Sequence, residues 1–205
     1  MNKRRVCLLI IDMQYDFLEP DSELFVKQGP AIIGKISELL SFFREHQLSI
    51  VFVRRLHRKD GSDIDKPRAD LFSKTGGFLI EGSRGAQIVE KLKPLDNEIV
   101  ITKKRWSAFF GTELDLILRR SNINTLIMCG VQTPNCIRAT FTDAISFDYD
   151  VVVMEDGTAS NNEETQRANL NDMKNMGARI MSVKEIVELL NNELPSKIKS
   201  ANKNR

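Results

Sequence analysis

Short, continuous apolar runs recur along this chain, and they constrain its fold more than any other feature. They are rich in valine and isoleucine and lie at residues 6–11, 49–53, 98–101, 125–129, 151–154 and 179–182. A strand that is apolar on both sides must be covered on both faces, as strands of parallel sheets are. The runs therefore predict six buried strands.

Stretches with helical periodicity separate these runs. They lie at residues 30–46, 84–92, 112–120, 134–147, 161–176 and 183–191. Strands that alternate with helices predict an α/β protein with a three-layer αβα doubly wound fold and a mainly parallel six-stranded sheet. The exception is residues 54–82, which have little periodicity, and a loop of that length is usually functional or a lid.

The length of 205 residues is enough for one compact core. We expect a single domain over residues 1–195 and a frayed basic tail over 196–205, since terminal residues without apolar anchors rarely order. Basic side chains crowd that tail: Lys197, Lys199, Lys203 and Arg205. A weak anion-binding arm is the alternative interpretation of the tail.

The net charge of +2 indicates no nucleic-acid partner, because phosphate binding requires basic residues gathered on a folded face. The first apolar run is too short to span a bilayer, so we expect no membrane partner. The chain has three cysteines, and an odd number argues against a disulfide framework and for a reducing compartment. We therefore expect the cytoplasm.

Cys136 follows the fourth run in the segment Gly130-Val131-Gln132-Thr133-Pro134-Asn135-Cys136. Thr133 is a suitable N-cap and Pro134 a suitable first helical residue, which places Cys136 in the first turn of a helix. Free N–H groups there favour a thiolate, so we expect a lowered pKa and a nucleophilic sulfur. By contrast, Cys7 and Cys129 lie within apolar runs and are interpreted as packing residues.

Asp12 directly follows the first run, and Lys103 comes just after the third run, beyond Thr102. A carboxylate after a buried strand either caps a turn or serves a site, and a lone lysine there is usually solvated. However, Asp12, Lys103 and Cys136 all lie at the carboxyl edge of the predicted sheet, where the fold can bring them together to activate a nucleophile. Asp16 is a weaker acidic candidate, and Lys104 competes with Lys103.

Four segments resemble the isochorismatase-like cysteine hydrolases, which include nicotinamidases, N-carbamoylsarcosine amidase, ureidoacrylate and biuret amidohydrolases, and isochorismatases. The segments are residues 11–17, 103–109 with Thr112 and Leu114, 130–136, and 155–159. The resemblance implies that Asp12, Lys103 and Cys136 form a catalytic triad. It also implies a cis peptide at Val131-Gln132 and an oxyanion hole made by the N–H groups of Gln132 and Cys136.

Metal-containing nicotinamidases carry an Asp-x-His sequence after the second strand, where this chain has Arg55-Leu56-His57. His46 is the only other histidine, and a metal site requires several convergent ligands. We therefore expect no metal and no cofactor, and interpret His57 as a polar loop residue.

Four further residues are candidates for the substrate pocket. Arg105 and Arg138 would either pair with a substrate carboxylate or serve as structural ion-pair partners. Phe17 and Trp106 would either line the pocket or belong to the core.

The resemblance implies a metal-independent hydrolase that cleaves a small amide or ureido compound through a thioester. Nicotinamidase is the alternative within the same class, and a non-catalytic homologue that acts as an interaction protein is the alternative from another class. Relatives of this kind often assemble, so we expect a homo-oligomer, either a dimer or a tetramer.

Overall fold

The computed structural model describes residues 5–193, and the predicted basic tail lies outside them. Six strands form one sheet in the order β3-β2-β1-β4-β5-β6, and every neighbouring pair is parallel. The strands are β1 (Val6–Ile11), β2 (Ser49–Arg55), β3 (Ile99–Lys103), β4 (Thr125–Val131), β5 (Asp150–Ala159) and β6 (Arg179–Met181). The prediction of six parallel strands is confirmed.

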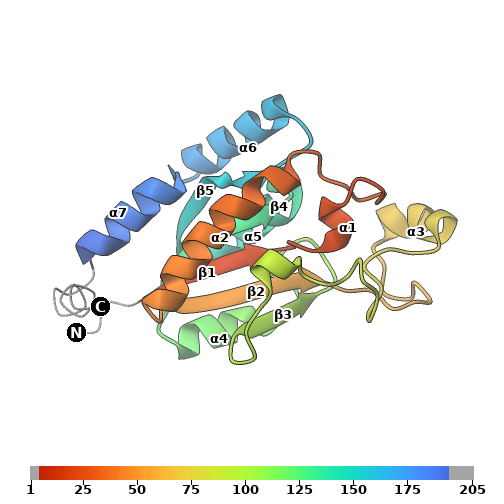
Figure 1. Ribbon diagram of the computed structural model, residues 1–205, viewed down its shortest axis with the longest axis horizontal. Coiled ribbons are helices and arrows are strands. Elements are labelled where there is room, and N and C mark those ends of the chain that lie inside the picture. Colours follow the sequence, from red (N-terminus) through yellow and green to blue (C-terminus); the bar gives the residue numbers. More distant parts are fainter. Residues whose placement is uncertain (1–4, 194–205) are drawn as a thin grey trace.

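Helices cover both faces of this sheet (Figure 1). They are α1 (Tyr15–Leu18), α2 (Gly29–Glu45), α3 (Ala69–Thr75), α4 (Leu114–Arg120), α5 (Arg138–Ser146), α6 (Glu163–Asn175) and α7 (Val183–Glu193), with short turns η1 (Lys66–Arg68), η2 (Glu90–Leu92) and η3 (Thr133–Ile137). Helices α2 and α7 pack on one face, and α4, α5 and α6 on the other. The three layers are those that the sequence predicts.

The two cores explain why the strands read as unbroken apolar runs. In β1, Leu8 and Ile10 enter the core under α2, whereas Cys7, Leu9 and Ile11 enter the core under α4 and α5. Side chains of a strand alternate between faces, so a sheet that is covered twice needs apolar residues at every position. No helix within residues 5–193 is long and apolar enough to cross a membrane.

Residues 84–92 are not the helix that their periodicity predicts. Residues 84–87 form bends and turns, and the segment lies beside residues 13–16, with an antiparallel bridge between Gln14 and Ile88 and a hydrogen bond from Val89 N to Met13 O. Only η2 is helical there. Tertiary hydrogen bonds have overridden a short amphipathic pattern.

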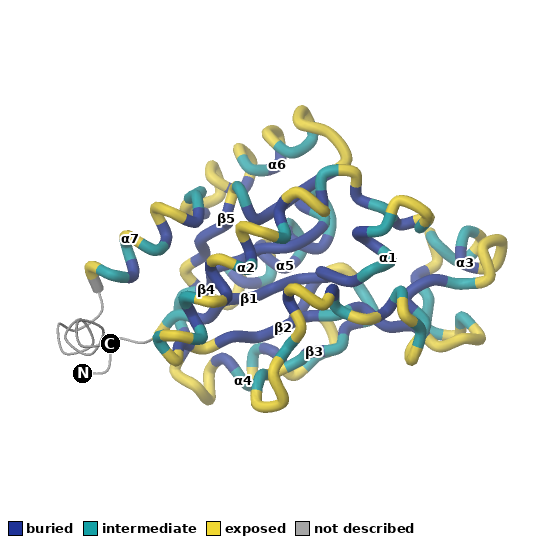
Figure 2. Tube along the Cα trace, in the orientation of Figure 1, coloured by how far each residue is buried: buried dark blue, intermediate teal, exposed yellow. Residues whose placement is uncertain are grey.

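The interruption at residues 54–82 is more ordered than its composition suggests. It holds η1 and α3 and projects beyond the carboxyl ends of the strands (Figure 1). Its backbone returns to the sheet edge, where His57 pairs with Ile80. Burial continues from the strands into this segment (Figure 2), because Phe72, Phe78 and Leu79 are almost fully enclosed.

Candidate active site

Three side chains that the sequence singles out meet at the carboxyl edge of the sheet. The Nζ atom of Lys103 donates to Asp12 Oδ2 at 2.7 Å and to Cys136 Sγ at 3.3 Å. Its third hydrogen bond goes to the carbonyl oxygen of Arg105 at 3.1 Å. Asp12 and Lys103 are completely buried and Cys136 is 4% exposed. Water therefore competes little with these contacts.

The strand order explains why Asp12 and Cys136 come together. Strands β1 and β4 are neighbours, and the chain moves outward from them in opposite directions, which makes this edge the topological switch point where doubly wound sheets bind ligands. Asp12 follows β1 with a positive φ of 56°, and its N–H donates to Val53 O. Its Oδ1 atom has no hydrogen-bond partner among residues 5–193, so this oxygen is available to take a proton.

Cys136 lies in η3, a single π-helical turn that begins directly after β4. Gly130 precedes it with a φ of 116°, and a Cβ there would collide with the carbonyl oxygen of Ile11. Only glycine permits this close approach of β4 to β1. The peptide bond between Val131 and Gln132 is cis.

The capping role that the sequence predicts for Thr133 is wrong. Gln132 is the N-cap residue of the turn, and its carbonyl oxygen accepts from the N–H groups of Asn135 and Ile137. The Thr133 hydroxyl is buried and makes no hydrogen bond within the described part of the chain.

The surroundings of Cys136 favour a neutral thiol, not the thiolate that we expected. Burial and the charge of Asp12 raise the pKa of Cys136 to about 11, although Lys103 and Arg55 act in the opposite direction. Lys103 is already paired with Asp12, so a neutral thiol leaves this buried group of three without net charge. Transfer of the thiol proton from Cys136 to Asp12 keeps the net charge of the group at zero. The arrangement therefore favours this transfer.

We expect alkylation of Cys136 by iodoacetamide to be slow at pH 7 and to accelerate roughly tenfold per pH unit up to about pH 10, because the thiolate is the reactive form. Labelling of the intact protein, followed by mass spectrometry, measures this rate. Cys136→Ser corrects for labelling of Cys7 and Cys129. A rate that is already constant above pH 7 would show that the resting sulfur is ionised.

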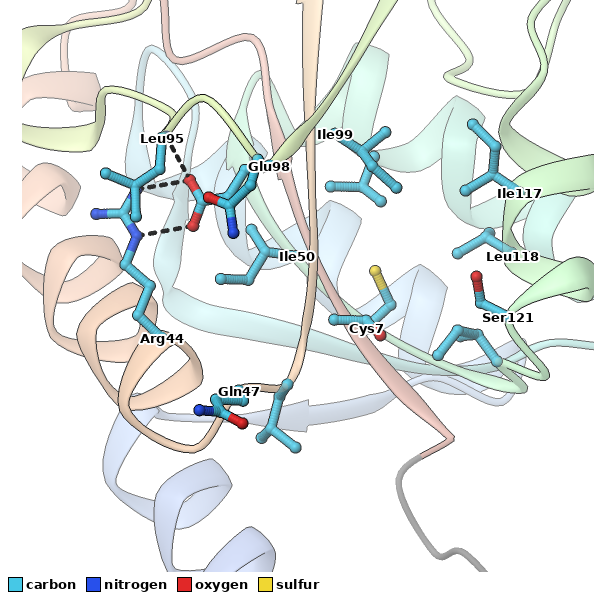
Figure 3. Close-up of a pocket in the computed structure, with 15 residues that line it drawn as sticks. Cys7, Arg44, Gln47, Ile50, Leu95, Glu98, Ile99, Ile117, Leu118 and Ser121 are labelled. Carbon is cyan, nitrogen blue, oxygen red and sulfur yellow. Dashed lines mark hydrogen bonds and ion pairs between the residues drawn. The ribbon is translucent and has the colours of Figure 1, made fainter.

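Neither Cys7 nor Cys129 belongs to this site. Cys7 lies near the start of β1 and lines a hollow of about 410 Å³ that the Arg44–Glu98 ion pair borders (Figure 3). Burial raises the pKa of Cys7 to about 12 and raises that of Cys129 as well. Both thiols are therefore poor nucleophiles at neutral pH.

The structure places the competing candidates away from the sulfur. Lys104 follows β3, and its Nζ atom binds Leu56 O and Asp63 Oδ2, both at 2.8 Å. Asp16 accepts a hydrogen bond from Leu79 N at 2.6 Å and so holds the segment after α3 in place.

Both arginines proposed for the pocket are engaged elsewhere. Arg105 donates to the carbonyl oxygens of Asp63 and Lys104. Arg138 donates to Asn169 Oδ1 at 2.9 Å and pairs with Asp172. Arg138 therefore has the structural ion pair that was its alternative role, whereas Arg105 bonds to backbone carbonyl oxygens.

The two aromatic candidates divide between core and surface. Phe17 is buried in the core under α2, whereas Trp106 is 43% exposed. Trp106 borders an open hollow of about 550 Å³ whose lining residues are Asp65, Pro67, Arg105, Trp106, Ser107, Phe110, Ala139, Thr142 and Asp143. Asp12, Lys103 and Cys136 are not among them, so the hollow borders Asp65 and not the three central side chains.

His57 is not the polar loop residue that we expected, because it is completely buried. Its Nε2 accepts from Arg55 Nε at 3.0 Å, and its Nδ1 lies 3.3 Å from Asp63 Oδ1. Burial and the charge of Arg55 lower the pKa of His57 to about 4, so the ring is neutral at pH 7.

Arg55 and Gln14 are buried polar residues that the sequence analysis missed. The Gln14 side chain exchanges two hydrogen bonds with the backbone of Arg55 and fixes the end of β2. A signal for Arg55 was present in the sequence, since it comes two residues after the apolar run at 49–53, as Lys103 comes two residues after the run at 98–101.

The chain is similar to solved and curated proteins over most of its length. A protein of Arabidopsis thaliana named "probable inactive nicotinamidase" is 37% identical over 91% of this chain and 97% of its own. The crystal structure of an isochorismatase family protein from Desulfovibrio vulgaris is 41% identical, covers 92% of this chain and 99% of its own, and superposes with a TM-score of 0.88.

A third relative, the pyrazinamidase of Pyrococcus horikoshii, was solved in complex with zinc. It is 29% identical, covers 87% of this chain and 99% of its own, and has a TM-score of 0.75. The residues at 55–57 of this chain do not fit a zinc site. His57 Nε2 is occupied by Arg55, whose cation would repel a divalent ion, and residues 5–193 contain no group of three His, Cys, Asp or Glu placed to hold a metal.

The family model "Isochorismatase domain" matches residues 6–185, which include the whole sheet and the three buried side chains. This chain belongs to the isochorismatase family of hydrolases.

Proposed function

We propose that this protein hydrolyses a C–N bond of a small amide or ureido compound through a thioester on Cys136. The observation that carries the proposal is the contact of Lys103 Nζ with both Cys136 Sγ and Asp12, inside a buried site at the switch point of the sheet. A thiol, a carboxylate with one unpartnered oxygen and an ammonium are the parts that such a reaction requires.

In the first half of the reaction, Asp12 takes the proton of Cys136 as the sulfur attacks the amide carbonyl carbon. A C–S bond forms and the carbonyl electrons move to oxygen. We assign the stabilisation of this oxyanion to the N–H groups of Gln132 and Cys136, and a donor of that kind contributes about 10²–10³ in rate. The C–N bond then breaks, and Asp12 returns the proton to the leaving nitrogen.

In the second half, a water molecule attacks the thioester and gives its proton to Asp12. The C–S bond breaks, the carboxylic product leaves, and the proton returns to the sulfur. Lys103 stays positively charged throughout and holds Asp12 and Cys136 in register. No step in this scheme requires a metal or a cofactor.

Two alternatives remain open to test. Nicotinamidase activity would belong to the same chemistry with a particular substrate. A non-catalytic homologue is the alternative that the name of the Arabidopsis relative supports. Against it, an interaction protein has no need to keep Asp12, Lys103 and Cys136 in mutual contact.

We expect the purified protein to release ammonia from at least one member of a panel of small amides and ureido compounds that includes nicotinamide. The rate should be unchanged by EDTA and should fall at least about 10³-fold in Cys136→Ala, since the nucleophile is lost. Cys129→Ala, which removes a thiol from a buried strand, is the matched control and should keep its activity. Chelator-sensitive turnover of nicotinamide would favour the nicotinamidase with metal, and no turnover of any compound would favour the non-catalytic homologue.

A further inference from the structure

A buried guanidinium stands beside the three side chains just described. Arg55 pairs with Lys103 in the register of β2 and β3, so both side chains leave the same face of the sheet. Arg55 is completely buried, and its Nε and Nη2 atoms bind His57 and Asp65. Its Nη1 atom is buried too and has no partner among residues 5–193.

A second guanidinium lies close to the first. Arg68 ends η1, and its Nη1 atom is likewise buried without a partner in the described chain. Burial and the positive charge of Arg55 lower the pKa of Arg68, whereas the negative charges of Asp65 and Asp12 raise it. Arg68 is therefore within electrostatic reach of both Arg55 and the site.

The negative groups nearby do not balance these two cations. Asp65 bonds to Arg55 and also acts on Arg68, whereas Asp12, which acts on Arg68 as well, is paired with Lys103. Asp63 is paired with Lys104. His57 is neutral at pH 7, and a guanidinium does not lose its proton in proteins. One positive charge is left uncompensated.

Buried N–H groups without partners are costly, and an uncompensated buried charge is more so. A ligand that brings one negative charge and two acceptor oxygens would satisfy both guanidinium groups at once. A carboxylate meets that description, since its two oxygens match the planar donors of arginine and it carries a single charge. Asp65, which binds Arg55, also lines the open hollow of about 550 Å³.

We propose that Arg55 and Arg68 form a subsite for a carboxylate of the substrate, so that the preferred compounds are small acids that also carry an amide or ureido group. The substrate assignment rests on the proposed hydrolase function. The subsite itself is a statement about binding, and it can be tested on protein that cannot turn over.

The binding test uses succinate as the probe and Cys136→Ala as the protein, with isothermal titration calorimetry. We expect succinate to bind, and neutral succinamide to bind about 10–100-fold more weakly, because hydrogen bonds to charged groups are lost. Adding Arg68→Gln should weaken the binding of succinate by a similar factor. Adding Arg55→Lys, which keeps the positive charge but loses the planar pair of N–H donors, should do the same. Adding Arg138→Gln, which removes a guanidinium bound to Asn169 and Asp172, should not.

The kinetic test compares ammonia release from ureidoacetate and from its methyl ester. We expect kcat/KM to favour the acid by about 10–100-fold, and Arg68→Gln to bring that ratio towards one. Equal binding of succinate and succinamide, or insensitivity of both tests to the two arginine variants, would overturn the subsite. Succinate binding through the arginines without turnover of any amide would instead leave the subsite standing and refute the hydrolase.

Discussion

Asp12→Asn is expected to lower kcat for amide hydrolysis by about 10³-fold and, at the same time, to make Cys136 easier to alkylate. An asparagine cannot take the thiol proton or return it to the leaving nitrogen, and positioned acid–base groups contribute about 10²–10⁴ in rate. The Asp12 charge also raises the pKa of Cys136, so its removal should lower that pKa and increase labelling by iodoacetamide at pH 8. Steady-state kinetics and timed alkylation measure the two effects.

The opposite signs of these effects make the prediction specific. A variant that merely distorts the site would change hydrolysis and alkylation together. Asp16→Asn is the matched control, because its amide oxygen can still accept from Leu79 N and it does not contact Cys136. If Asp12→Asn slowed alkylation as well as hydrolysis, Asp12 would have to activate the resting sulfur, and the thiol assignment would be wrong.

Lys103→Met is expected to have the largest effect on stability. The ammonium and the Asp12 carboxylate are both completely buried and lie 2.7 Å apart. Methionine fills similar space but leaves the carboxylate without its partner, and breaking a buried pair in this way costs about 3–5 kcal/mol. Urea unfolding followed by circular dichroism measures the loss, and hydrolysis should disappear with it.

The double variant Asp12→Asn with Lys103→Met separates charge from packing. It removes both charges, so much of the lost free energy of unfolding should return although activity does not. Lys104→Met is the control, since that side chain is 41% exposed and a partly solvated ion pair contributes about 1 kcal/mol or less. A loss from Lys104→Met as large as that from Lys103→Met would contradict the assignment of the buried lysine.

The protonation state of Cys136 determines how the site can work. A helix start favours a thiolate, but this sulfur is 4% exposed and lies beside a carboxylate whose charge already balances Lys103. Desolvation and Asp12 therefore outweigh the helix. The arrangement suits transfer of the proton during attack, rather than storage of a reactive anion.

The sequence by itself determined the fold and the three central side chains. Unbroken apolar runs require a sheet that is covered on both faces, and parallel strands bring residues that follow them to one edge. Asp12, Lys103 and Cys136 were found in this way, because Asp12 directly follows β1, Lys103 ends β3 and Cys136 lies in the turn after β4. These inferences need only local patterns and the rules of parallel sheets.

Only the tertiary structure decided how residues distant in sequence meet. Residues 84–92 follow a helical pattern but pair with residues 13–16, and the segment around Arg68 folds back towards a strand that ends at Arg55. Arg55 was not selected from the sequence, because no local pattern indicates that a guanidinium will be buried with an N–H donor that has no partner. Charge balance and desolvation depend on all neighbours in space, and for that reason the pKa of Cys136 and the surplus charge beside it emerge only from the folded chain.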